Sequence, residues 1–240
     1  KVKDFRDNQV KRGAILAEEQ ILDALLPPLM LQPEDADADA KNETGERLEF
    51  EDFCELAQKK NVQLIGRSGG SGKTTLMTKL FHHQLKLCEA DPDNQAIPLY
   101  IEAKSLVSKN KLILRHLSYL LFDDDTVITS SETHGPADEL STAFKVRRKI
   151  PRYMLLIDGY NELPKNSLKT LNSELEEYLP NGIYESVRLV ISSREVCKDL
   201  PKGEFAQVNI LSLEERSLRN YLDPAQWQKI SNNKSLKTIL

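Results

Sequence analysis

The stretch VQLIGRSGGSGKTTLMTKL, residues 62–80, places a loop rich in glycine and serine between an apolar run and a run of helix-forming residues. Glycines let successive backbone N–H groups turn inward around an anion, because a Cβ would obstruct that path. The helix that follows adds the unpaired N–H groups and the dipole of its N-terminus. The order of strand, loop and helix therefore predicts a cradle for a phosphate group.

Two side chains extend this prediction to nucleotides. In a loop of this kind, Lys73 reaches the β- and γ-phosphates and the Thr74 hydroxyl binds Mg²⁺. The strict pattern, G-x-x-x-x-G-K-[ST], has a glycine where this chain has Arg67, and Gly66 stands one residue earlier. We therefore predict a loop one residue longer at its entry, rather than a flexible Gly/Ser linker, which would need neither the apolar run nor the helix. The candidate nucleotide-binding residues are Ser68, Gly69, Gly70, Ser71, Gly72, Lys73, Thr74 and Thr75.

A second chemical stretch, YMLLIDGYNEL, occupies residues 153–163. A continuous apolar run that ends in an acid is typical of a buried parallel strand, which delivers a carboxylate to the ligand-binding edge of its sheet. We expect Asp158 to hold Mg²⁺ through water and Glu162 to polarise an attacking water molecule. The alternative is a strand followed by a turn whose acids face solvent.

A third candidate follows the strand predicted at 187–191. This strand runs into two serines and then Arg194, which is thereby expected at the C-terminal edge of the sheet. An arginine there can sense or neutralise a γ-phosphate, whereas the alternative is an ordinary surface arginine. The candidate catalytic residues are thus Glu162, Asp158 and Arg194, and the candidate metal ligands are Thr74 and Asp158.

Composition bounds the class of protein. The chain has 240 residues, enough for a substantial core, and its formal charge of −4 argues against a protein that coats nucleic acid. We expect no direct nucleic-acid binding, and we interpret the basic segment at 145–149 as cations that complement a helix C-terminus. Three scattered cysteines, Cys54, Cys88 and Cys197, suit a reducing compartment and predict a cytoplasmic location. Because no apolar run approaches 18 residues, no membrane span is predicted.

Alternating strand and helix patterns predict an α/β fold with three layers around a central, mostly parallel, five-stranded sheet. The expected strands are 62–65, 97–102, 153–158, 187–191 and 206–210, with helices at 49–60, from 74 onward, and at 168–179. A proline, Pro98, predicts that the second strand lies at a sheet edge. The expected domains are a helical lead-in with an acidic loop (1–60), a nucleotide-binding domain (61–211) and the start of a helical domain (212–240). We expect the chain to be part of a longer protein.

The acidic loop also resembles a calcium-binding pattern. Its residues Asp35, Asp37, Asp39 and Glu46 fall at positions 1, 3, 5 and 12 of an EF-hand loop. Position 6, however, is Ala40, where the sharp turn needs glycine, and prolines interrupt the incoming helix. We therefore interpret this segment as a solvated acidic loop and not as a calcium site.

Three stretches together carry a resemblance to a known family. The segment LIDGYNEL at 156–163 resembles the Walker B stretch of the NACHT family, one branch of the STAND signal-transducing P-loop ATPases. The segment VISSR at 190–194 resembles the sensor-1 strand of that family, and residues 211–222 resemble the Leu-Ser-x-Glu…Tyr-Leu signature at which its helical domain begins. The resemblance covers roughly residues 20–222.

The resemblance implies an AAA+-like P-loop NTPase fold and a switch that is ADP-bound and closed at rest and ATP-bound and self-oligomeric when active. It also implies flanking effector and sensor domains, in bacterial antiphage defence or animal innate immunity. Two departures, Arg67 and Asn161 in place of a frequent acid, suggest slow ATP hydrolysis. The alternatives are an AAA+-type motor and a catalytically inactive nucleotide-binding scaffold.

Overall fold

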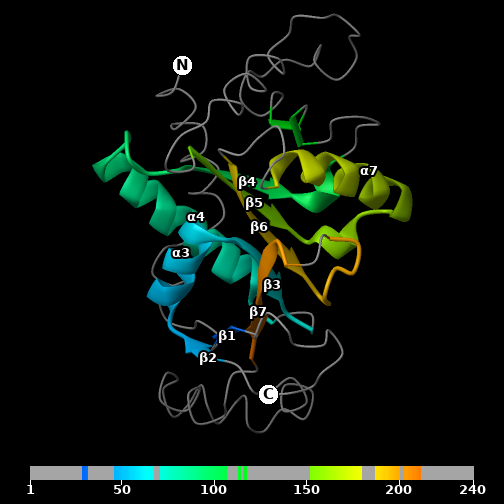
Figure 1. The fold of residues 1–240 in the computed structure, drawn as a ribbon, viewed down its shortest axis with the longest axis horizontal. Coiled ribbons are helices and arrows are strands. Elements are labelled where there is room, and N and C mark those ends of the chain that lie inside the picture. The colour runs from blue at the N-terminus through cyan, green and yellow to red at the C-terminus, as the bar shows by residue number, and fades with distance from the viewer. Residues whose placement is uncertain are drawn as a thin grey trace, which may run out of the picture.

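A seven-stranded sheet forms the centre of the molecule (Figure 1). The computed structural model describes residues 29–31, 46–67, 71–106, 113–114, 116–117, 152–179, 187–200 and 203–211. In this part of the chain the strand order is β2-β1-β7-β3-β6-β5-β4. The last five strands in that order are parallel to one another, which confirms the predicted five-stranded parallel core.

The parallel strands lie close to their predicted positions. They are β3 (Asn61–Ile65), β4 (Ile97–Glu102), β5 (Tyr153–Asp158), β6 (Val187–Ser193) and β7 (Phe205–Ile210). The strand that contains Pro98, β4, is the last in the order, at the edge that the proline predicts.

Two short strands extend the sheet beyond the prediction. They are β1 (Leu29–Leu31) and β2 (Glu46–Leu48), which pair with each other in antiparallel fashion. Strand β1 also pairs antiparallel with β7, with Leu29 opposite Ile210. The sequence predicts a helical lead-in and an acidic loop in this region, and no strand. A three-residue strand is too short to show an alternating pattern in the sequence. Strand β1 can be recognised only from its pairing with the edge of β7.

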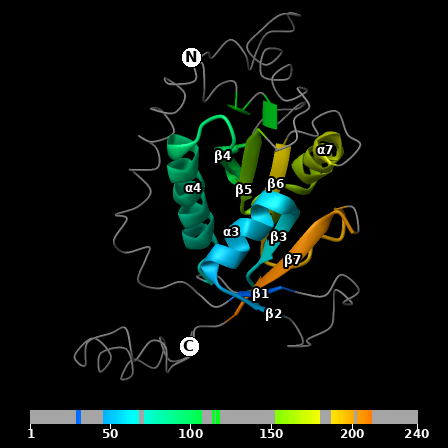
Figure 2. The same cartoon turned by 60° about the vertical axis from the view of Figure 1, so that its left-hand side comes forward.

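Helices cover both faces of the sheet, which confirms the three-layer α/β architecture (Figure 2). One face carries α3 (Phe50–Lys59) and α4 (Lys73–Ala90), and the other carries α7 (Lys165–Leu175) followed by the 3₁₀ turn η4 (Glu176–Tyr178). None of the helices in the described part of the chain combines the length and the hydrophobicity that a membrane span needs.

The two apolar clusters explain the continuous apolar run in β5. Successive side chains of a strand point to opposite faces, so Leu155 and Ile157 join the cluster under α7, and Met154 and Leu156 join the cluster under α3 and α4. Both faces of β5 are therefore buried, and a strand buried on both faces needs apolar residues at every position. The acid at the end of β5 is therefore the point where this strand leaves the core.

A buried carboxylate fastens α7 to the helical residues at 113–114. The Glu174 side chain is 4% exposed and accepts hydrogen bonds from the backbone N–H groups of Ile113, at 3.1 Å, and Leu114, at 3.2 Å. Hydrogen bonds to a charged acceptor are stronger than neutral ones, and they offset the cost of burying the carboxylate. The sequence pattern gave no sign of this contact.

Replacement of Glu174 by alanine should lower the free energy of unfolding by about 2–3 kcal/mol, because two buried N–H donors lose their acceptor. The variant Glu174→Gln keeps an acceptor oxygen at nearly the same volume and should lose less. Urea unfolding followed by circular dichroism measures both. If Glu174→Ala unfolds at the midpoint of the unchanged protein, the carboxylate does not stabilise the fold.

Candidate nucleotide-binding site

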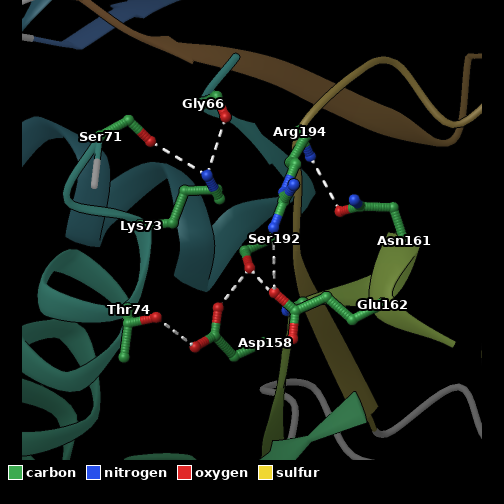
Figure 3. A network of polar contacts seen from close by, with 10 residues as sticks. Gly66, Ser71, Lys73, Thr74, Asp158, Asn161, Glu162, Ser192 and Arg194 are labelled. Atoms are coloured by element: carbon green, nitrogen blue, oxygen red, sulfur yellow. Dashed lines mark hydrogen bonds and ion pairs between the residues drawn. The ribbon is translucent and has the colours of Figure 1, made fainter. Parts of the chain in front are cut away.

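Candidate residues from both motifs, together with Arg194, meet at one edge of the sheet, where the parallel strands end (Figure 3). Asp158 is the last residue of β5, Arg194 follows β6, and Gly66 follows β3. The helix α4 begins at Lys73, and Glu162 ends the 3₁₀ turn η3 (Tyr160–Glu162). Parallel strands place their carboxyl ends at a common edge, and this is where ligands bind in open α/β sheets.

The Lys73 side chain folds back over the start of the loop. Its Nζ donates hydrogen bonds to the Gly66 carbonyl oxygen at 2.8 Å and to Ser71 Oγ at 3.0 Å. A Cβ added at Gly66 would lie 2.3 Å from Ser71 Oγ and 2.8 Å from Lys73 Cγ, so a side chain here would have to displace the side chains of Ser71 and Lys73. Gly66 thus lies close to the Lys73 side chain, as the first glycine of the strict pattern would, while Arg67 is exposed.

The structure describes only part of the predicted phosphate loop. Ser71, Gly72, Thr74 and Thr75 are described together with Lys73, and Gly72 adopts the left-handed conformation, with φ +87°, just before α4. Ser68, Gly69 and Gly70 lie outside the described residues. The additional residue at the loop entry stays a prediction.

Two cations face the same space from different elements. Burial lowers the pKa of the Lys73 ammonium, and the positive charge of Arg194 lowers it further, while Asp158 and Glu162 act in the opposite direction. Lys73 and Arg194 therefore repel each other across the site. A bound anion between them would relieve this repulsion, so the electrostatics of the site suit a phosphate group.

The Asp158 carboxylate accepts hydrogen bonds from three hydroxyl groups. Its Oδ2 accepts from Thr74 Oγ1 at 2.8 Å and from the Tyr100 hydroxyl at 2.9 Å, and its Oδ1 accepts from Ser192 Oγ. The Ser192 oxygen also accepts from the Gly159 N–H at 2.9 Å. A hydroxyl and a carboxylate oxygen side by side are hard donors of the type that Mg²⁺ prefers, so Thr74 and Asp158 fit the predicted metal.

Tyr100 and Ser192 are site residues that the sequence analysis missed. Burial, and then the nearby Asp158 carboxylate, raise the pKa of the Tyr100 phenol well above its usual range. Ser192 could have been identified from its place in the strand that leads to Arg194. The contact of Tyr100 depends on the register of the edge strand β4 against β5, which sequence alone does not supply.

The turn after β5 joins Glu162 to Arg194. Arg194 Nη2 lies 3.8 Å from Glu162 Oε1, and the Arg194 backbone N–H donates to Asn161 Oδ1 at 3.0 Å. The two charged side chains are 55% and 47% exposed, and an ion pair this exposed contributes about 0–1 kcal/mol. The guanidinium is therefore held loosely enough to turn toward a phosphate, while its backbone stays tied to the turn.

Gly159 is required for that turn. Its φ is +80°, and a Cβ built there would lie 3.1 Å from the Glu162 Cδ. A side chain would thus meet both the steric cost of left-handed backbone and a contact with the candidate catalytic acid.

The interpretation of the acidic segment as a solvated loop is not tested, because most of its acids lie outside the described residues. In the described part of the chain no group of three potential metal-ligating side chains occurs. Of the four acids in the EF-hand pattern, Glu46 is the first residue of β2. Asp35, Asp37 and Asp39 lie outside the described part, as do the basic segment at 145–149 and residues 212–240.

The variant Gly66→Ala should weaken nucleotide binding about tenfold or more, because the added methyl group displaces the Lys73 side chain from its place under the loop. The neighbouring variant Arg67→Ala removes an exposed side chain and should bind as the unchanged protein does. Titration with a fluorescent ADP analogue measures both affinities. Equal binding by the two variants would contradict the role assigned to Gly66.

No curated protein matches this chain significantly. Several solved structures resemble it at low sequence identity. The ORC1 protein of Aeropyrum pernix, solved in complex with DNA, is 15% identical with a TM-score of 0.51, over 90% of this chain and 53% of that one. A STAND protein with a tetratricopeptide repeat sensor from Pyrococcus horikoshii is 12% identical with a TM-score of 0.35, over 87% of this chain and 28% of that one. This chain thus spans about half the length of the ORC1 protein, and the likeness to it supports the fold alone.

A family model identifies the chain more closely. The model of the NACHT domain matches residues 60–226, which is more than half of the sequence and includes the loop, the β5 acid and Arg194. The geometry described above lies within this match. The chain therefore belongs to the NACHT family of P-loop NTPases.

Proposed function

We propose that this NACHT domain is a switch that binds ATP and ADP with Mg²⁺, hydrolyses ATP slowly, and couples its nucleotide state to self-association and signalling. The observation that carries the proposal is the convergence of Lys73, Thr74, Asp158, Glu162 and Arg194 at one edge of the sheet. These are the residue types that hold a triphosphate, its metal and an attacking water in P-loop NTPases.

The proposed roles follow from the positions of the side chains. Lys73 and the N-terminus of α4 would hold the β- and γ-phosphates, and Thr74 and Asp158 would hold Mg²⁺, Asp158 through water. Mg²⁺, when bound, neutralises charge on the phosphate oxygens. Glu162 would orient and polarise the water that attacks the γ-phosphate.

The pairing of Arg194 with Glu162 supports a switch over a motor. In the structure the guanidinium lies against the carboxylate that would polarise water, and Asn161 holds the backbone of Arg194 in place. A γ-phosphate would attract Arg194 and release Glu162, so catalysis would depend on a rearrangement inside the site. An AAA+-type motor remains the second candidate, and the complete set of polar residues argues against a scaffold that has lost nucleotide chemistry.

The wider role is proposed from the family. We infer flanking effector and sensor domains, self-oligomerisation on activation and a part in immune or antiphage defence. We also propose a cytoplasmic location from the cysteine usage, with Cys54 and Cys197 present as thiols. The DNA in the ORC1 complex is not carried over to this chain, whose net charge is −4.

Lys73→Ala should abolish measurable binding of Mg-ATP and Mg-ADP, because it removes the ammonium that lies between Gly66 and the site. The matched control is Lys86→Ala, which removes an exposed lysine from the same helix. Isothermal titration calorimetry on the purified domain provides the affinities. Unchanged affinity in Lys73→Ala would refute the assignment of the phosphate loop.

Glu162→Gln should keep nucleotide affinity and lower ATP turnover at least a hundredfold, because the amide cannot accept a proton from water. The control Glu176→Gln changes an exposed acid in η4 and should leave turnover unchanged. Release of inorganic phosphate under single-turnover conditions is the measurement. Equal turnover in Glu162→Gln and the unchanged protein would move the catalytic role to another residue.

A further inference from the structure

The tyrosine that contacts Asp158 comes from the edge strand of the sheet. In the register of β4 against β5, Tyr100 lies opposite Leu156 and Glu102 lies opposite Asp158. Side chains alternate between the two faces of a sheet, so Tyr100 and Asp158 point to the same face. They lie on neighbouring strands, and Asp158 is two residues beyond the residue of β5 that pairs with Tyr100. The Tyr100 side chain reaches diagonally from β4 to β5, and its hydroxyl donates a hydrogen bond to Asp158 Oδ2 at 2.9 Å.

One face of the helix α4 contacts both Asp158 and Tyr100. Thr74, Thr78 and Phe81 are spaced at i, i+4 and i+7 on α4, so they share a face of that helix. Thr74 donates to Asp158, and the Phe81 ring lies edge-on to the Tyr100 ring, at 6.1 Å between centroids. The Tyr100 ring is thus held by its hydrogen bond to Asp158 and by the aromatic contact with Phe81 before any ligand binds.

This arrangement constrains the carboxylate from two sides. Ser192 holds Oδ1 from β6, and Tyr100 holds Oδ2 from β4, so the carboxylate cannot rotate without breaking a hydrogen bond. Mg²⁺ demands nearly ideal octahedral geometry, and a carboxylate that serves it gains from being held in advance. Groups that orient a metal-binding carboxylate commonly change metal affinity by 10- to 100-fold when they are removed.

We propose that Tyr100 is a positioning residue for Asp158, which fixes the carboxylate for Mg²⁺-dependent nucleotide binding. The inference rests on the proposed function, because it assumes that nucleotide and Mg²⁺ bind at this edge. It goes further in assigning part of the metal geometry to β4, a strand that contains no residue of either nucleotide-binding motif.

The test compares nucleotide affinity with Mg²⁺ and with EDTA in the variant Tyr100→Phe. The phosphate contacts of Lys73 do not involve Tyr100, so ADP affinity in EDTA should stay within twofold of that of the unchanged protein. The gain in affinity on adding Mg²⁺ should fall about tenfold, because Asp158 Oδ2 loses one of its two hydroxyl donors and the only one from β4. Fluorescent ADP titration gives both quantities in the absence of turnover.

Two further variants make the result specific. Phe81→Leu removes the ring that lies against Tyr100 and keeps an apolar side chain, and should lower the Mg²⁺-dependent gain in affinity by a smaller factor than Tyr100→Phe does. Tyr153→Phe makes the matching change at the far end of β5 and should behave as the unchanged protein in both buffers. Thermal unfolding of each variant confirms that it is folded.

The outcomes separate this inference from the proposed function. If the unchanged protein gains affinity with Mg²⁺ and Tyr100→Phe gains as much, the positioning role is overturned while nucleotide binding stands. If Tyr100→Phe loses affinity equally in EDTA and in Mg²⁺, Tyr100 has a general structural role, and the proposal is likewise overturned. If the unchanged protein binds no nucleotide in either buffer, the proposed function fails and this inference fails with it.

Discussion

The site depends on the parallel alignment of β3, β6 and β5. Because these strands run in the same direction, their carboxyl ends reach one edge, and the phosphate loop, Arg194 and Asp158 emerge there side by side. The alignment is possible because helices cover both faces of the sheet, so that each strand can be apolar throughout. The polar residues of the site begin where that double burial ends.

Hydroxyl groups connect the elements that meet at this edge. Thr74 comes from α4, Tyr100 from β4 and Ser192 from β6, and all three donate to the one carboxylate of Asp158. Neutral donors can be packed around a carboxylate without the desolvation penalty of a second buried charge. The carboxylate is thereby held in place by neutral groups, which suits a residue proposed to bind a metal ion.

Arg194 and Glu162 are less constrained than Lys73 and Asp158. Arg194 and Glu162 are about half exposed, and their separation of 3.8 Å implies a weak contact. Their backbones, in contrast, are fixed by Asn161 and by the left-handed turn at Gly159. A rigid backbone with movable charged ends is suited to a site that changes its contacts when a γ-phosphate is present or absent.

Features that depend on local pattern could be predicted from the sequence. The phosphate loop, the acid at the end of β5 and the edge position of β4 all follow from residues that are close together along the chain. The distant residues that complete the site could be identified only from the folded arrangement. Tyr100, Ser192 and the link from Asn161 to Arg194 depend on strand register, and Glu174 and β1 depend on which surfaces pack together. Register and packing are set by contacts between segments far apart in the sequence, and no local periodicity encodes them.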